Sequence, residues 1–178
     1  YLEGSAEYKH HVEHYGHPSE VGFKDIIPLF KAEKWNPDKL VEFYKKIGAQ
    51  YFFALGNHHD NFDLWDSKYQ AWNSKNMGPK RDILAEWEQA ARKYELPFGI
   101  SFHADHAWTW YEPSQRYDRN GPKAGVPYDG TLTKADGKGK WWEGYDPQDL
   151  YAQNHPMSKG SWVDGMIHSQ WAWGNGAC

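Results

Sequence analysis

Two groups of polar side chains follow two short apolar runs in this sequence. The run 49–55 is followed by His58, His59 and Asp60, and the run 98–102 is followed by His103, Asp105 and His106. Imidazole and carboxylate groups could ligate a divalent metal ion that activates water, as in a metal-dependent hydrolase. Histidines could instead bind sugar hydroxyls while two carboxylates elsewhere cleave a glycosidic bond. Composition and spacing leave both chemistries open.

The elements that must position these groups are two helices and two strands. Asn36-Pro37 is typical of a helix start, and an apolar stripe then predicts a helix over 37–47, before Gly48. The run 49–55 is short and aromatic, which predicts a buried strand that ends at Gly56. The same order repeats as a helix over 82–94 and a strand over 98–102.

Helix and strand in alternation, with short links, imply parallel strands joined by right-handed crossovers. The fold class is therefore α/β. In such folds the functional residues lie at the carboxyl ends of the strands, so the two polar groups should meet at one rim. A (β/α)8 barrel takes about 250 residues, and this chain has 178. We expect part of a (β/α)8 (TIM-like) barrel that is incomplete in this chain.

Composition excludes several classes of protein. Twenty basic and 24 acidic residues give a net charge of −4, which argues against a nucleic-acid binder. The mean hydropathy is −0.94, and we expect no membrane span. A single cysteine excludes an internal disulfide framework. The 11 tryptophans suit either a sugar-binding surface or a packed core, and a non-catalytic sugar-binding module remains a further alternative.

Other residues have weaker patterns. Glu7 to His14 is predicted to be helical, and the histidines of this region favour an exposed helix face over a metal site. Gly78 to Asp82 lacks the glycine spacing of a phosphate-binding loop and is interpreted as the turn before the second helix. Trp108, beside His103, is a candidate platform for a sugar ring.

A long ordered match then points to a family. The stretch from Gly56 to Lys68, followed by Trp72-Asn73-Ser74 and Gly78-Pro79-Lys80-Arg81-Asp82, resembles the α-L-fucosidases of glycoside hydrolase family 29. That family has an H-H-D-G-F-x-L-W-x-S-K stretch that leads to G-P-x-R-D and the next helix. Trp35-Asn36-Pro37, Phe98-Gly99 and Glu7-Tyr8 resemble further motifs of the family.

The resemblance implies a catalytic (β/α)8-like domain that removes terminal α-L-fucose with retention of configuration. It places fucose hydroxyls on His58, His59 and Glu7, with Tyr8 where the family has tryptophan. It also implies substrate contact at His103 and Trp108. It further implies chemistry that uses no cofactor and no bound metal. Asn61 stands where the family commonly has glycine, so this position should require a positive φ, which asparagine tolerates.

The resemblance also exposes a difference, because the family's nucleophile is an aspartate that follows a later apolar strand. Trp162-Val163-Asp164 imitates that context, but the preceding residues 156–160 do not suit a buried strand. We therefore expect residues 1–178 to form a partial catalytic domain without the first strand and without the later strands that carry the nucleophile and the acid/base. The chain alone is then expected to be inactive, with Asp164 as a minor candidate nucleophile.

The resemblance further implies a fucosylated oligosaccharide or polysaccharide as the partner. Enzymes of this kind act in secreted, periplasmic or lysosomal settings, although the sequence shows no signal peptide. The sequence does not determine the fucose linkage, the source polymer or the oligomeric state.

Overall fold

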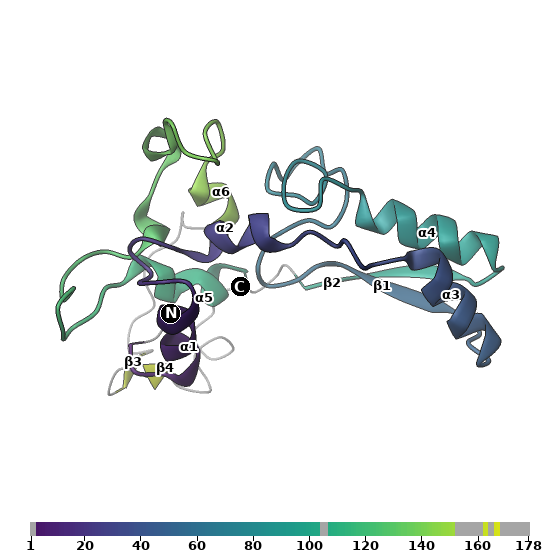
Figure 1. Ribbon diagram of the computed structural model, residues 1–178, viewed down its shortest axis with the longest axis horizontal. Helices are drawn as coiled ribbons and strands as arrows, with labels where there is room; N and C mark the ends of the chain where they lie inside the picture. The colour runs from purple at the N-terminus through teal and green to yellow at the C-terminus, as the bar shows by residue number, and fades with distance from the viewer. Residues whose placement is uncertain (1–2, 104–106, 152–161, 164–165, 168–178) are drawn as a thin grey trace.

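The computed structural model describes residues 3–103, 107–151, 162–163 and 166–167 (Figure 1). Its principal elements are two parallel strands, each preceded by a helix. The elements in chain order are α1 (Ala6–His14), α2 (Phe23–Ile26), η1 (Ile27–Leu29), α3 (Pro37–Lys46), β1 (Phe52–Asn57), α4 (Ile83–Lys93), β2 (Phe98–Phe102), α5 (Ala107–Tyr111), η3 (Glu112–Gln115), η4 (Asp129–Thr131), η5 (Lys134–Gly137), α6 (Pro147–Tyr151), β3 (Trp162–Val163) and β4 (Met166–Ile167).

Each of the two helices before the strands begins directly after a residue whose side chain caps it. The side chain of Asn36 accepts a hydrogen bond from the Lys39 amide at 3.0 Å, and Pro37 is the first residue of α3. The side chain of Asp82 accepts one from the Ala85 amide at 2.8 Å at the start of α4. The sequence predictions of helices over 37–47 and 82–94 are confirmed to within one residue at each end. The helical Glu7 to His14 segment is confirmed as α1.

Strands β1 and β2 pair in parallel, as the alternation predicts, with Phe52 opposite Phe98. The prediction that Gly56 ends the first strand is wrong, because β1 begins at Phe52 and continues through Asn57. A Cβ atom at Gly56 would lie 2.8 Å from the Phe102 ring and 2.9 Å from the Ile100 side chain. Glycine is therefore required here for close packing inside the strand and does not form a turn.

The two helices cover one side of the strand pair. Val41 of α3 and Ala91 of α4 are fully buried in a cluster with Leu96, against which Phe52 and Phe98 pack. Phe53, whose side chain lies on the opposite side of β1, is 63% exposed. Helices outside and an open inner strand face are the arrangement expected of two consecutive units of a (β/α)8 barrel.

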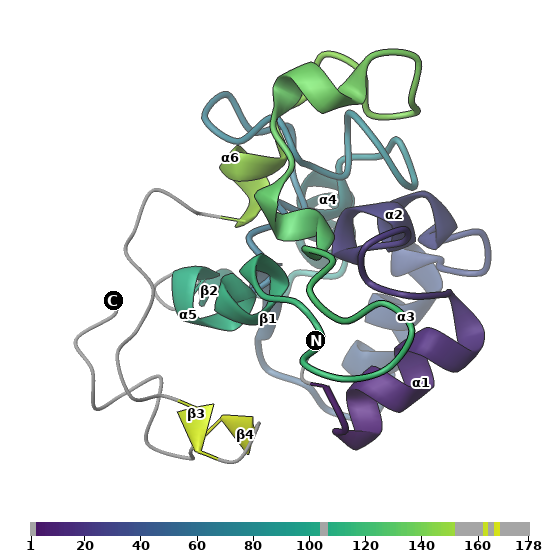
Figure 2. The same cartoon turned by 90° about the vertical axis from the view of Figure 1, so that its left-hand side faces the viewer.

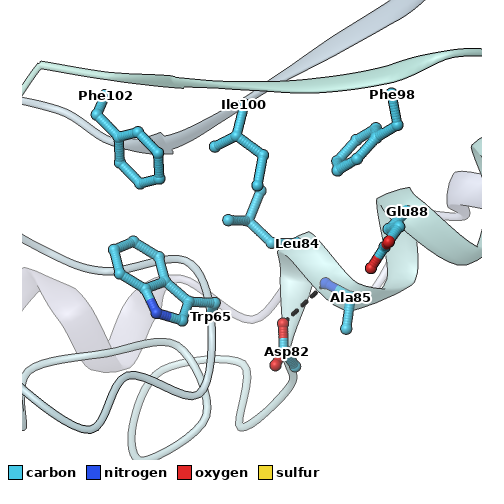
Figure 3. Close-up of a pocket in the computed structure, with 8 residues that line it drawn as sticks. All are labelled: Trp65, Asp82, Leu84, Ala85, Glu88, Phe98, Ile100 and Phe102. Carbon is cyan, nitrogen blue, oxygen red and sulfur yellow. Dashed lines mark hydrogen bonds between the residues drawn. The ribbon is translucent and has the colours of Figure 1, made fainter.

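A hollow of about 400 Å³ lies between β2 and α4 (Figure 3). Phe98, Ile100 and Phe102 line it from the strand, and Leu84 lines it from the helix. The centroid of the Trp65 ring lies 5.6 Å from that of the Phe102 ring, in an edge contact. Trp65 bounds the hollow on the side of the loop after β1. The hollow is mostly apolar and lies on the helix-covered face of the sheet.

A second hydrophobic cluster joins the long connection between β1 and α4 to the helical turns that follow β2. Helices α5 and α6 of these turns lie to the left of the strand pair in Figure 1. Trp72 is its most buried indole, and its Nε1 donates to the Asp146 carbonyl at 2.7 Å. The buried members are Phe62, Trp72, Met77, Tyr111, Trp142, Leu150 and Tyr151.

A buried ion pair ties the N-terminal segment to the residues that follow β2. The Lys24 ammonium lies 3.2 Å from Oδ2 of Asp129, and both side chains are almost wholly buried. The Tyr151 hydroxyl donates to the same carboxylate and accepts from the Lys24 amide at 3.0 Å. Burial raises the pKa of Asp129, while the charge of Lys24 opposes the rise.

Within the described part of the chain, no helix is long and apolar enough to cross a membrane.

Asn61 has the conformation that its place in the sequence predicts. Its φ is +53°, in the left-handed region. Its side-chain amide donates to the carbonyl groups of Asp149 and Leu150 at 2.9 and 3.0 Å, so the loop after β1 is tied to α6. Asparagine thus supplies two hydrogen bonds that a glycine at this position lacks.

We expect Asn61→Ala to be less stable than Asn61→Gly by about 1 kcal/mol, because alanine adds left-handed backbone strain to the same lost hydrogen bonds. Both variants should be less stable than the original chain. Urea denaturation measures the free energies of unfolding. An Asn61→Ala variant as stable as Asn61→Gly would contradict the role assigned to the positive φ.

Candidate functional site

The parallel pairing of β1 and β2 brings three histidines together at the carboxyl ends of the strands. The His103 amide donates to the Asn57 carbonyl at 3.0 Å, which extends the ladder one residue beyond β2, at the last residue of β1. The His58 and His103 rings then stack, with centroids 5.0 Å apart and planes inclined by 15°. The His59 ring lies 4.3 Å from that of His58. This confirms the prediction of one rim; we call His58, His59 and His103 the histidine cluster.

A buried carboxylate fixes the loop that carries His58 and His59. Asn57 donates from Nδ2 to Oδ1 of Asp63 at 2.6 Å, and Asp63 is 5% exposed. Burial raises the pKa of Asp63, while hydrogen bonds from Ser67 and Asn57 oppose the rise. The Asp63 amide donates to the Trp72 carbonyl at 3.2 Å. The direction in which the chain leaves β1 is therefore set by buried polar contacts.

The histidine cluster can present several hydrogen-bonding groups to a ligand. One ring nitrogen from each of its three histidines lies within 4.8 Å of the others. His58 and His59 are half-buried and His103 is exposed, with its Nε2 3.1 Å from the Ser101 hydroxyl. A neutral imidazole has one donor and one acceptor nitrogen, which suits adjacent sugar hydroxyls. Three imidazoles are also a donor set for zinc.

Of the other three residues in the two polar groups, the structure describes only Asp60. Asp60 follows the histidines, and its backbone carbonyl accepts a hydrogen bond from the Tyr111 hydroxyl at 2.6 Å. Desolvation by the surrounding protein raises the pKa of the Asp60 carboxyl, and the nearby His58 opposes the rise. Asp105 and His106 lie outside the described residues.

Tryptophan contributes to the cluster at a position that sequence reasoning missed. Trp110 lies in α5, with its ring centroid 5.8 Å from that of His59 and 6.4 Å from that of His58. The sequence predicts Trp108 instead. Trp108 belongs to the same helix, but its side chain lies outside the described part of the structure. The sequence favours Trp108 because it is nearer than Trp110 to the polar group after β2. Only the turn of α5 shows that Trp110 contacts His58 and His59.

Glu7 and Tyr8 occupy the first turn of α1, which lies apart from β1 and β2 in both Figure 1 and Figure 2. Glu7 is exposed. Hydrogen bonds from its own backbone amide and from the Ser5 side chain lower the pKa of its carboxyl group. The Tyr8 hydroxyl donates to Asp118 at 2.5 Å, and burial together with this bond raises the pKa of the phenol. The described contacts of Tyr8 thus lie within a buried polar cluster around Asp118. Substrate contact by either residue stays a prediction.

Asp118 is the acceptor at the centre of that polar cluster. His17 Nε2 lies 2.9 Å from its carboxylate, and the Tyr128 hydroxyl also donates to it. Burial by itself would raise the pKa of Asp118. The hydrogen bonds from Tyr128, Tyr8 and His17 outweigh that effect and hold its pKa below the usual 3.8. The ionised carboxylate therefore ties α1 to the segment 118–128.

We expect Asp118→Asn to lower stability at pH 7 by about 1–3 kcal/mol, because three donors lose a charged acceptor. Since the folded-state pKa lies below the unfolded value, this contribution is present above about pH 4 and is lost as the pH falls through the folded-state pKa. Denaturation at several pH values should show the gap between variant and original chain narrowing on acidification. A gap that stays constant with pH would contradict this account.

Comparison with solved structures defines the class of protein. The chain is similar to the Thermotoga maritima alpha-fucosidase, solved in complex with fucose and in complex with a mechanism-based inhibitor. In both comparisons the sequence identity is 37% and the TM-score 0.54, covering 56% of this chain and 23% of the solved one. The helix and strand pairs are thus part of a (β/α)8 barrel, as the sequence predicts.

Sequence comparison identifies the family. The model of the family described as Alpha-L-fucosidase matches residues 1–175, and the chain belongs to this family. Human plasma alpha-L-fucosidase is 34% identical over 99 residues, which is 54% of this chain and 21% of the relative. Bovine tissue alpha-L-fucosidase is 33% identical over 104 residues, which is 58% and 22%. The chain thus spans about a fifth of the length of these relatives.

Proposed function

We propose that this chain is part of a retaining exo-glycosidase that releases terminal α-L-fucose, and that its histidine cluster binds fucose hydroxyls. The observation that carries the proposal is the position of this cluster, at the carboxyl ends of two parallel strands. These strands lie in a chain whose family match runs over residues 1–175. The fucose-bound Thermotoga maritima relative supports the same ligand.

The geometry suits hydroxyl recognition in physical terms. Half-buried imidazoles form stronger hydrogen bonds than exposed ones, because less water competes for their nitrogens. The rings of His58 and His103 are stacked, so their nitrogens lie close together. A neutral imidazole offers one donor and one acceptor nitrogen, which suits two adjacent sugar hydroxyls.

Bond cleavage in this proposal requires two carboxyl groups about 5 Å apart. One attacks the anomeric carbon as a carboxylate and displaces the glycosidic oxygen, which takes a proton from the other. Water then releases fucose from the enzyme and returns a proton to the second group. We assign neither role to a described residue, and Asp164, the minor candidate for the nucleophile, lies outside the described residues. The chain supplies substrate binding, and Glu7, Tyr8 and Trp108 remain proposed contacts.

The substrate class is a fucosylated oligosaccharide or polysaccharide with fucose at a terminus. A secreted, periplasmic or lysosomal setting fits this substrate. One of the relatives is named a plasma enzyme, which supports a setting outside the cytoplasm.

We expect His59→Ala, in the natural protein that contains this chain, to lower kcat/KM for an aryl α-L-fucoside by at least about tenfold, through loss of hydrogen bonds to the sugar. The matched control is His14→Ala, because His14 is exposed on α1 and its Nδ1 bonds the His10 carbonyl of the same helix. Steady-state kinetics distinguishes the two variants. Equal activity of His59→Ala and His14→Ala would overturn the assignment of the cluster.

A chelator distinguishes the fucosidase from the metal-dependent hydrolase that the residue types also allow. We expect hydrolysis of the aryl fucoside to continue at an unchanged rate after treatment with EDTA, because the proposed chemistry uses carboxyl groups. Elemental analysis of the untreated protein should show no stoichiometric transition metal in the histidine cluster. Loss of activity that zinc restores would favour the metal mechanism.

A further inference from the structure

We propose that Trp110 is the platform for the leaving group, the sugar ring to which fucose is attached. This inference rests on the proposed function and adds the part of the substrate that lies beyond fucose. It starts from one feature of the structure, a large aromatic side chain that borders the histidine cluster and remains 50% exposed.

The neighbouring residue fixes the direction in which Trp110 projects. Tyr111 is 3% exposed, and its ring packs against Phe23 and Tyr151 at 5.4 and 4.8 Å. Its hydroxyl donates to the Asp60 carbonyl, which anchors α5 to the loop that carries His58 and His59. Because Tyr111 is locked inward, the adjacent Trp110 is held at the surface beside the cluster.

Exposure differs between the residues of the site. His58 and His59 are half-buried, whereas His103 and Trp110 are exposed. An exo-acting site encloses the terminal sugar and leaves the rest of the glycan outside. A fucose bound to His58 and His59 would therefore have its outward neighbour over Trp110. The centroid separations of 5.8 and 6.4 Å are close enough for one glycan to contact both the imidazoles and the indole.

The chemistry of the two surfaces matches this division. Imidazole nitrogens bind hydroxyl groups, and the flat face of an indole packs against the C–H face of a sugar or against an aryl ring. The indole selects for a flat apolar face and not for a particular hydroxyl pattern. Trp110 would thus strengthen binding of different leaving groups, while the histidines select fucose.

The experiment compares a ligand that fills only the fucose position with one that extends beyond it. In the natural protein that contains this chain, we would measure Ki for L-fucose as an inhibitor and KM and kcat for 4-nitrophenyl α-L-fucopyranoside. Trp110→Ala should raise KM about three- to tenfold and leave Ki for L-fucose within about twofold. Trp110→Phe should retain most of the affinity because it keeps an aromatic face.

The matched control is Trp141→Ala. Trp141 is also about half exposed, at 43%, but its indole donates to Asp25 in another part of the structure, so neither constant should change. Thermal denaturation verifies folding, and Trp110→Leu replaces the alanine variant if that variant does not fold.

The possible results separate this inference from the proposed function. An equal loss for both ligands would place Trp110 on fucose itself and overturn the inference, as would no change for either ligand. Absence of both L-fucose inhibition and fucoside hydrolysis in the unmodified protein would overturn the proposed function and this inference with it.

Discussion

The parallel hydrogen-bonded pairing of β1 with β2 is the constraint on which the site depends. The pairing shifts register between Leu55 and Asn57, and beyond this irregularity the His103 amide bonds the Asn57 carbonyl at the end of β1. This one ladder determines that His58 and His103, 45 positions apart in the sequence, stack at the same edge. A shift of register would separate them or turn one ring to the other face of the sheet. The pairing of the strands therefore determines where the proposed sugar-binding histidines lie.

The strand pair depends on specific contacts on its helix-covered face and at the end of β1. On the helix-covered face, Gly56 leaves room for Phe102 and Ile100. At the end of β1, the contact of Asn57 with Asp63 directs the chain into the loop of the histidine cluster. The buried carboxylates of Asp118 and Asp129 in turn tie the N-terminal segment to the residues after β2. The site is thus held by buried polar contacts as well as by the apolar clusters.

Sequence reasoning predicts those parts of the structure that depend on local patterns. Capping by Asn36 predicts the start of α3, the apolar stripe predicts α4, and the order of elements predicts that His58 and His103 meet. Gly56 was misinterpreted because its role depends on contacts with a strand more than 40 residues later in the chain. Trp110 was missed for the same reason, since its contact with His59 depends on the path of α5. Tertiary packing of this kind has no signature in local spacing.

The measurement that tests the central claim most directly is the configuration of the sugar first released from an aryl α-L-fucoside by the natural protein that contains this chain. Proton NMR during the first turnovers would follow the two anomers before they equilibrate in solution. The account predicts that α-L-fucose appears first, as double displacement through a carboxylate requires. Initial release of β-L-fucose would contradict the retaining mechanism, and no release of fucose would contradict the function.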